Sequence, residues 1–290
     1  MSSALSIISV LLGLLIPLVG PAYAQDSGVV APIAQGDLPA SKKTPEKTAV
    51  KPTPIPDDIK IVEQLGAQLP LSWVLTDEEG AKRPLAAFLD GEQPVILVPV
   101  YYSCPLLCNI TLNRLISSLQ ALPWTPGTGY RIVTFSIDAR EGPELAKAKK
   151  ISYLKELSRP GAETGWHFLT SSADTIRKLT DVIGFGYRYD PDRLEYLHRA
   201  ALIILSPTGE VVRYMHGPYT PPIQLKLALL KAGQGSLGTL KERLWSRLFT
   251  YEDDRRTYAL DSTLIGTILA IMLLVPLGLT VLIFRRRPTT

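Results

Sequence analysis

The stretch VILVPVYYSCPLLCNITLNRL, residues 95–115, decides the fold. Residues 94–101 are apolar and β-branched, as in a buried central strand, and residues 109–122 repeat apolar side chains at close to helical spacing. Between them lie Cys104 and Cys108, the only two cysteines among 290 residues. The pair is therefore predicted to lie in a strand-to-helix turn. There the positive end of the helix dipole favours the thiolate, the form that attacks disulfides and binds soft metals.

Four interpretations suit this cysteine pair: a structural disulfide, a redox dithiol, a metal clamp, or two thiols close together by accident. A disulfide over so short a loop stabilises a domain little, since the entropic gain grows with loop length. A copper clamp needs a third ligand, and soft thiolates with one imidazole select copper. His167 is predicted to be a packed or edge strand residue and His216 a surface turn residue, while His198 precedes a buried strand at a loop mouth. The residues alone leave open whether His198 is a ligand.

The other elements of the central region alternate between strands and helices. Their order is typical of an α/β, thioredoxin-like fold, with a central mixed sheet flanked by helices. We expect residues 59–232 to form this domain. The predicted strands cover 130–138 and 165–170, an antiparallel hairpin covers 199–217, and the predicted helices cover 143–157, 172–185 and 222–232.

The two ends of the sequence predict export and a membrane anchor. Residues 1–24 carry no charged side chain and end in Ala-Tyr-Ala, which is typical of a signal peptide. The proline-rich residues 25–58 are predicted to be a flexible linker. Residues 264–284 carry no charge, so a transmembrane helix is expected over 262–284. Arginines follow it, and the positive-inside rule then places the tail, 285–290, in the cytoplasm and the globular domain in the periplasm, anchored in the inner membrane by one span.

A juxtamembrane segment, residues 233–261, connects the domain to this span. Within it, residues 237–249 place Leu240, Leu244 and Trp245 along one face of a predicted helix. Two alternatives follow from this pattern: the helix lies on the bilayer surface, or it docks onto the domain.

The charge balance bears on the class of partner. The chain has 31 basic and 27 acidic side chains, and three of the basic ones are the arginines of the tail. The exported part is therefore almost neutral, and no basic face for nucleic acid is indicated.

Four stretches of the sequence carry a resemblance to a known family. VILVPVYYSCPLLCNITLNRL is followed by IVTFSIDAREGPELAKAKK, WHFLTSSADTIRKLTDVIGFGYRYD and LHRAALIILSPTGEVVRYMHG. Together they resemble the Sco/SenC family, thioredoxin-fold proteins that deliver copper to, or reduce the cysteines of, the copper A site of cytochrome c oxidase. The resemblance implies one copper ion per chain, held by Cys104, Cys108 and His198. It also places the family's acidic residue at Asp138, which ranks lower because a strand-end cap is its more ordinary role.

The chain departs from the family pattern beside the cysteines and in its anchor. Leu106 and Asn109 stand where the family has an acidic residue and a proline, and Leu197 replaces an aspartate before the histidine. Fewer acids near the site affect Cu(I), the softer ion, less than Cu(II). The family anchor is usually N-terminal, so a C-terminal span marks a divergent branch.

The resemblance implies a metallochaperone whose partner is the copper A-bearing subunit of cytochrome c oxidase, or another copper or thiol client. The alternative is a thiol-disulfide reductase, in which Cys104 and Cys108 are the redox-active pair and copper is not stably bound. Two further interpretations are a peroxidase of the same fold, disfavoured by the residues before Cys104, and a tethered docking module. Copper binding needs His198 and dithiol exchange largely does not, so this residue distinguishes the metallochaperone from the reductase.

Overall fold

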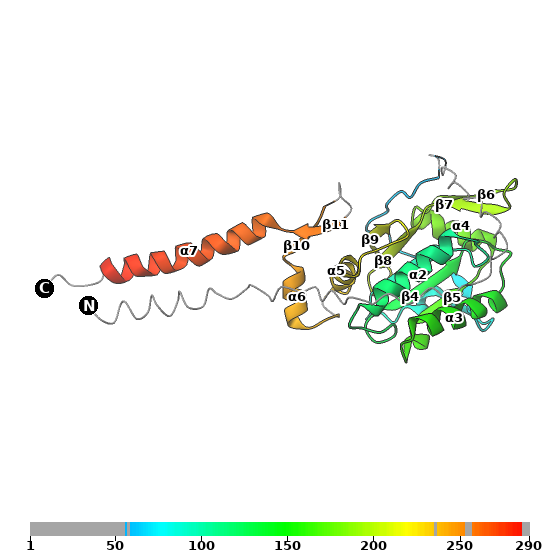
Figure 1. The fold of residues 1–290 in the computed structure, drawn as a ribbon, viewed down its shortest axis with the longest axis horizontal. Coiled ribbons are helices and arrows are strands. Elements are labelled where there is room, and N and C mark those ends of the chain that lie inside the picture. Colours follow the sequence, from blue (N-terminus) through cyan, green and yellow to red (C-terminus); the bar gives the residue numbers. More distant parts are fainter. Residues whose placement is uncertain (1–55, 57–58, 235–236, 253–256, 286–290) are drawn as a thin grey trace, which may run out of the picture. The chain divides into compact units, whose positions relative to one another are not determined.

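A computed structural model describes residues 56, 59–234, 237–252 and 257–285. All of these belong to one compact unit of the chain, which is drawn in Figure 1. The predicted signal peptide, the predicted linker apart from Pro56, and the predicted tail after Arg285 lie outside the described residues.

A five-stranded mixed sheet forms the centre of the fold, in the order β5-β4-β3-β8-β9. The first three strands of this order are parallel, and β8 and β9 run antiparallel to β3 and to each other. This sheet and its helices confirm the predicted α/β, thioredoxin-like architecture. The strands are β3 (Val95–Val100), β4 (Arg131–Ser136), β5 (Trp166–Leu169), β8 (Ala201–Leu205) and β9 (Val211–His216).

Four helices accompany the sheet, and each lies where its sequence pattern predicts one. Helix α2 contacts both α3 and α5, and α3 also contacts β5 (Figure 1). The helix predicted over 172–185 is shorter than expected, and Ser172 caps its start, because the Ser172 side chain accepts a hydrogen bond from Thr175 N. The helices are α2 (Leu107–Gln120), α3 (Pro143–Leu157), α4 (Ala173–Val182) and α5 (Pro222–Ala232).

Strand β3 carries the cysteine turn and is the most deeply buried strand. All six of its residues are buried, as its continuous apolar sequence predicts. Pro99 lacks an N–H and would normally disrupt a central strand. Here the pairing of β3 with β8 ends at Leu97, so the proline lies beyond the last residue paired on that side.

The hairpin that carries His198 was not among the predicted elements. Strands β6 (Tyr187–Asp190) and β7 (Glu195–His198) form a separate two-stranded antiparallel sheet. His198 is thus the last residue of a strand, not part of a loop mouth. Further short elements are β1 (Val74–Thr76), β2 (Lys82–Pro84), η1 (Leu85–Phe88) and η2 (Ala162–Thr164).

The helix predicted over 237–249 is too long. Helix α6 covers only Leu240–Ser246, closed at its start by a capping box between Thr239 and Glu242. The chain then turns into β10 (Phe249–Glu252), which pairs with β11 (Thr257–Leu260). The β-branched and aromatic residues of these strands favour the hairpin over a longer helix.

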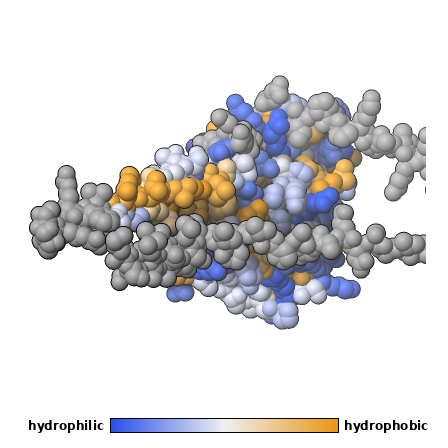
Figure 2. Space-filling view, turned by 60° about the vertical axis from the view of Figure 1, so that its left-hand side comes forward, coloured by the Kyte–Doolittle hydropathy of each residue, from blue (hydrophilic) through white to orange (hydrophobic). Residues whose placement is uncertain are grey.

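Helix α7 (Ser262–Arg285) follows β11 almost directly. At about 1.5 Å per residue it is long enough to cross a bilayer, and Ser262–Thr280 has the length and composition of a membrane span. Its apolar side chains form a continuous orange surface in Figure 2. The structure therefore fits the single C-terminal span that the sequence predicts.

Candidate metal centre

Three elements bring Cys104, Cys108 and His198 together. The cysteines lie in the turn after β3 and in the first turn of α2, and His198 ends β7. Each of the three is at most 5% exposed, and their sulfur and nitrogen atoms all lie within 4.8 Å of one another. Both cysteines are free thiols. The structure thus places the three predicted ligands in one cluster that could hold a metal ion.

The His198 ring is oriented by a backbone carbonyl. Its Nδ1 lies 3.1 Å from the carbonyl oxygen of Arg199, so in the neutral ring Nδ1 carries the proton and donates it there. Nε2 lies 3.4 Å from Cys108 Sγ, on the side of the two sulfurs. This arrangement leaves the Nε2 lone pair available to a metal, and an outer hydrogen bond on the other nitrogen is typical of metal-binding histidines.

The sulfur of Cys104 occupies the start of helix α2. The backbone N–H of Cys108 donates a hydrogen bond to Cys104 Sγ at 3.3 Å, so the sulfur satisfies an N–H that the helix itself leaves unpaired. Hydrogen bonds from the Cys108 thiol and from the Cys108 backbone N–H lower the pKa of Cys104 to about 3, although burial alone would raise it. Burial and the neighbouring Cys104 thiolate raise the pKa of Cys108. Cys104 is therefore the thiolate of the pair.

Aromatic rings enclose His198. The rings of Tyr101 and Phe185 lie with their centroids 5.9 and 5.8 Å from that of His198, and Tyr196 packs edge-on against Tyr101. The neighbouring Tyr102 instead enters the core, where its hydroxyl donates to the Leu169 carbonyl at 2.7 Å. Tyr102 therefore belongs to the core beneath the site.

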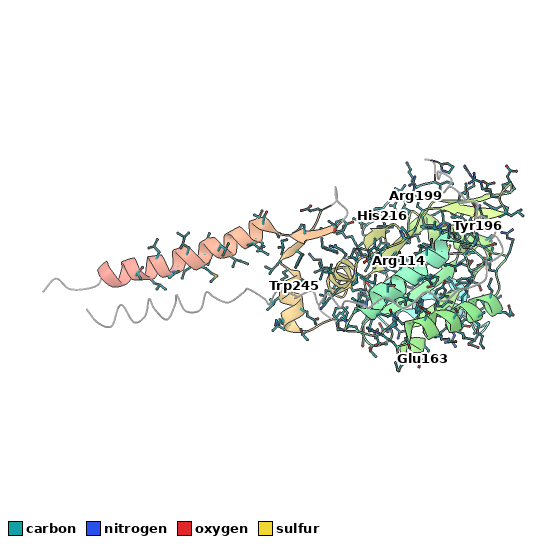
Figure 3. The ribbon with its side chains drawn as sticks, viewed as in Figure 1. Arg114, Glu163, Tyr196, Arg199, His216 and Trp245 are labelled. Carbon is teal, nitrogen blue, oxygen red and sulfur yellow. The ribbon has the colours of Figure 1, made fainter. Side chains whose placement is uncertain are left out.

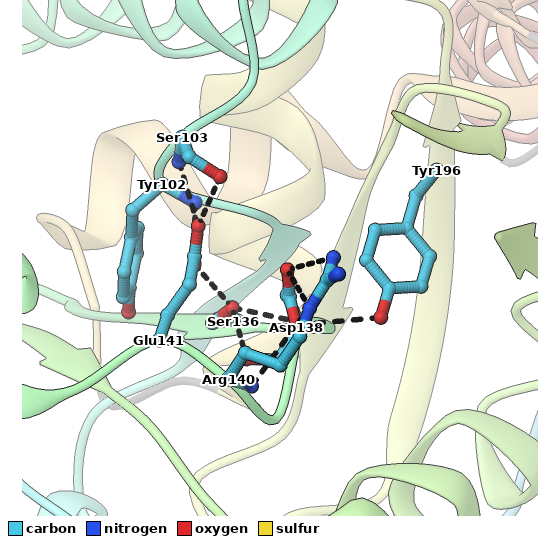
Figure 4. Close-up of polar contacts among 7 residues, drawn as sticks. All are labelled: Tyr102, Ser103, Ser136, Asp138, Arg140, Glu141 and Tyr196. Atoms are coloured by element: carbon cyan, nitrogen blue, oxygen red, sulfur yellow. Dashed lines mark hydrogen bonds and ion pairs between the residues drawn. The ribbon is translucent and has the colours of Figure 1, made fainter. Parts of the chain in front are cut away.

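A carboxylate that the sequence did not reveal fixes the cysteine loop (Figure 4). Glu141 accepts hydrogen bonds from the backbone N–H groups of Tyr102 and Ser103, each at 2.7 Å. The hydroxyls of Ser103 and Ser136 also donate to it, at 2.7 and 2.6 Å. Four donors on one carboxylate hold the residues just before Cys104 in a single position. No local pattern marks this role, because Glu141 lies 38 residues away from Ser103 in the chain.

Asp138, the acidic residue of the resemblance, is outside the cluster. Arg140 Nε and Nη2 pair with its carboxylate, with Nη2–Oδ2 at 2.7 Å, and Tyr196 donates to it at 3.3 Å. The Arg140 guanidinium also lies 4.6 Å above the Tyr189 ring. Figure 4 shows this group beside the Glu141 network, and Asp138 contacts the β6–β7 hairpin through Tyr196.

The two other histidines have different partners. His167 lies on the outer strand β5, as predicted, and its Nδ1 is 3.3 Å from Glu78 Oε1. His216 was expected on a surface turn, but it is mostly buried at the end of β9, with Nε2 2.5 Å from Glu63 Oε1. Neither joins the cluster.

Two departures from the family pattern have visible consequences. Asn109 Nδ2 donates to the Cys104 carbonyl at 3.0 Å, while its Oδ1 accepts from Tyr153 at 3.0 Å and from Lys149 at 3.3 Å. The asparagine thereby connects the cysteine turn to helix α3. Leu106, in the same turn, is 65% exposed, so an apolar side chain takes the place of an acidic one near the sulfurs.

Comparisons with known proteins give solved structures only, since no family model and no curated protein matches the chain. A putative electron transfer protein from Aquifex aeolicus VF5 is 25% identical, with a TM-score of 0.51, over 61% of this chain and 98% of that one. Copper-bound ScoI of Arabidopsis thaliana is 18% identical, with a TM-score of 0.42, over 52% and 87% of the two chains. Copper-bound ScoI of Bradyrhizobium japonicum is 18% identical, with a TM-score of 0.42, over 59% and 98%.

Proposed function

We propose that this chain is a divergent member of the Sco/SenC family that binds one copper ion through Cys104, Cys108 and His198. The observation that carries the proposal is the meeting of two sulfurs and one correctly oriented imidazole nitrogen within 4.8 Å, from elements 90 residues apart. The sequence resemblance and the similarity to ScoI structures, two of which hold copper, support it.

The donor set suits copper in its softer oxidation state. Two thiolates and one imidazole favour Cu(I), which tolerates low coordination numbers. The cysteines and the histidine must be deprotonated to bind the ion, so binding releases protons and is favoured by the already lowered pKa of Cys104. The ion is the cargo, and it leaves by ligand exchange with the thiols of a client.

The family assignment supports a client, and helix α7 with the arginines at its end supports a location. The partner that fits is the copper A-bearing subunit of cytochrome c oxidase, which receives copper or has its cysteines prepared for it. Helix α7 provides a single membrane anchor. The arginines at its end support a periplasmic position for the globular domain at the inner membrane.

The unequal cysteines support a second candidate function, a thiol-disulfide reductase. The Cys104 thiolate would attack one sulfur of a client disulfide, and the other client sulfur would leave as a thiolate. Cys108, deprotonated, would then attack Cys104 Sγ in the mixed disulfide. The client is released with both cysteines reduced, and Cys104 and Cys108 become a disulfide. A lowered pKa on the attacking cysteine, Cys104, is what such a reaction requires.

Replacing His198 separates the two functions. In a His198→Ala variant we expect copper affinity to fall about 100-fold or more, because the site loses a direct ligand and not merely an outer-shell partner. Reduction of a model disulfide should change much less, since the imidazole neither attacks nor leaves. Copper titration against a competing chelator and a disulfide-reduction assay on the same reduced samples measure both. Unchanged copper affinity would contradict the three-ligand site, and His167→Ala is the matched control.

Replacing Glu141 tests the support of the cysteine loop. A Glu141→Gln variant loses acceptor capacity for the N–H of Tyr102 or that of Ser103, so the loop before Cys104 is less fixed. We expect copper affinity to fall about tenfold, the lower end of the effect of outer-shell partners. The same chelator titration measures it. Glu163→Gln, a change at an exposed residue of the short η2 helix (Figure 3), serves as the control. Equal copper affinities in the two variants would show that the Glu141 hydrogen bonds to the cysteine loop do not affect the metal site.

A further inference from the structure

Helix α6 has one face on the domain and another face exposed. Lys226 of α5 pairs with Glu242 at 2.7 Å, and Leu237, just before the helix, is buried in the core. Leu240, Leu244 and Trp245 of the same helix nevertheless stay between 40% and 66% exposed. The juxtamembrane helix is therefore docked, and it still presents an apolar row to its surroundings. Figure 3 labels Trp245 on this helix.

The end of α6 is joined to the start of the membrane span. The backbone N–H of Asp261 donates to the carbonyl of Leu248 at 2.7 Å, directly after α6. The same aspartate caps α7, because its carboxylate accepts from Leu264 N at 2.9 Å and from Thr250 Oγ1 at 2.8 Å. These hydrogen bonds join the residues just after α6 to the first residues of α7. If α7 spans the bilayer, the apolar row of α6 lies at the level of the lipid headgroups, where tryptophan is enriched.

The hairpin between α6 and α7 is fixed to the domain as well. The Gln224 side-chain amide bonds both the N–H and the carbonyl of Tyr258, at 2.6 and 3.2 Å. The guanidinium of Arg213 lies 3.7 Å from the centre of the Tyr251 ring. These contacts prevent α6 and the hairpin from swinging freely, so the exposed row keeps one orientation relative to α5.

A cavity of about 500 Å³ opens between α5 and α6, next to the exposed row. Leu230, Leu240 and Leu244 supply its apolar lining, and Lys231 and Arg247 supply two basic groups. Lys231 Nζ donates to the carbonyl of Phe249 at 2.5 Å, which holds the ammonium group at the cavity. Apolar walls with two cations match a molecule that has an acyl chain and a negative headgroup.

We propose that this cavity binds an anionic phospholipid of the bilayer that α7 spans. The phosphate group lies between Lys231 and Arg247, and an acyl chain follows Leu240 and Leu244 along the exposed face of α6. The bound lipid fixes the domain against the membrane surface. The inference rests on the membrane anchoring in the proposed function and does not depend on copper.

The test uses the full chain in lipid nanodiscs that contain equal amounts of phosphatidylcholine and phosphatidylglycerol. The chain is released from the discs and the lipids that stay bound to it are identified by native mass spectrometry. We expect bound phosphatidylglycerol to exceed bound phosphatidylcholine about tenfold, since each basic residue near a membrane surface contributes to anionic lipid binding. A Lys231→Gln/Arg247→Gln variant should lose the preference. A Lys155→Gln/Lys178→Gln variant, with two exposed lysines changed on α3 and α4, should keep it.

Two further measurements make each outcome decisive. Arg247→Gln alone, which leaves the Lys231 bond to Phe249 in place, should still lower the preference. Brominated acyl chains quench the fluorescence of tryptophans that they contact. In Trp245→Phe this quenching should be weaker, because the proposed site places Trp245 next to the lipid. Equal retention of both lipids in discs that contain the chain would overturn the lipid site alone. Failure of the chain to enter discs would overturn the membrane span and the lipid site, while copper binding would stand.

Discussion

Copper binding is expected to disappear when Cys108 is replaced by serine, and equally when Cys104 is replaced. A serine hydroxyl stays protonated at neutral pH and is a hard oxygen donor, so it does not replace a thiolate toward Cu(I). The remaining sulfur and imidazole give two ligands in place of three. Serine has nearly the same shape as cysteine, so the loop should keep its fold. Copper per chain, measured after gel filtration of reduced protein, should fall from one to none in Cys104→Ser and in Cys108→Ser.

An Asn113→Ser variant is the control, because this residue is exposed on the same helix α2 and faces no ligand. It should keep one copper per chain. One ion retained in Cys108→Ser would place the copper elsewhere and end the proposed site. Copper lost from all three variants would instead indicate that helix α2 is disturbed by any change, which near-ultraviolet circular dichroism would reveal.

The soluble fragment for these measurements should end after Leu260. Leu237 and Tyr258 are buried in the same core as the sheet, and the Tyr258 backbone is bonded on both sides by Gln224. A fragment cut after Ala232 would expose the apolar side of α5. The longer fragment keeps this core and omits the apolar helix α7.

The sheet and its helices were predictable because their signals are local. The apolar run of β3 and the helical spacing after it identify the turn that carries the cysteines. Helices α3 and α5 begin and end where predicted, since Pro143 and Pro222 lie at their first positions and suit a helix start.

The partners of the cysteines could not be predicted from local pattern. The contact between Cys108 and His198 joins residues 90 apart, and it depends on the β6–β7 hairpin, whose tip holds Leu194 in a left-handed conformation at φ +55°. Glu141 reaches the cysteine loop only because β4 is parallel to β3, which brings their carboxyl ends to one edge of the sheet. Family resemblance supplied His198, and nothing in the sequence supplied Glu141.

Loss of the Glu78 carboxylate is expected to destabilise the domain by about 3 kcal/mol at pH 7. Glu78 is buried, pairs with Lys150 through a short contact, and accepts from Phe168 N at 3.1 Å. Burial alone would raise its pKa, but hydrogen bonds from His167 and Lys150 outweigh it and lower the pKa from an ordinary 4.5 to about 2. A shift of this size corresponds to about 3 kcal/mol of stability for the ionised form. Glu78→Gln removes that contribution and leaves a buried ammonium without its counterion.

The lowered pKa of Glu78 determines how the stability of the domain changes with pH. The pKa of Glu78 is lower in the folded state than in the unfolded state, so its contribution is complete above about pH 4.5 and is lost as the pH falls toward 2. Urea unfolding of the fragment ending at Leu260, at a series of pH values, should show the parent losing more stability than Glu78→Gln over this interval. A stability difference that stays constant from pH 7 to pH 2 would contradict the assignment.

The neighbouring Glu79 provides a matched control within the same turn. It also pairs with a lysine of α3, Lys147, at 2.6 Å, but both side chains of that pair are more than half exposed to solvent. Water and salt screen such a pair, and each long side chain loses rotamer freedom in forming it. Glu79→Gln should therefore change the free energy of unfolding only slightly and without a transition between pH 4.5 and 2. The contrast between two adjacent glutamates, each with its own lysine, isolates burial as the cause of the larger loss.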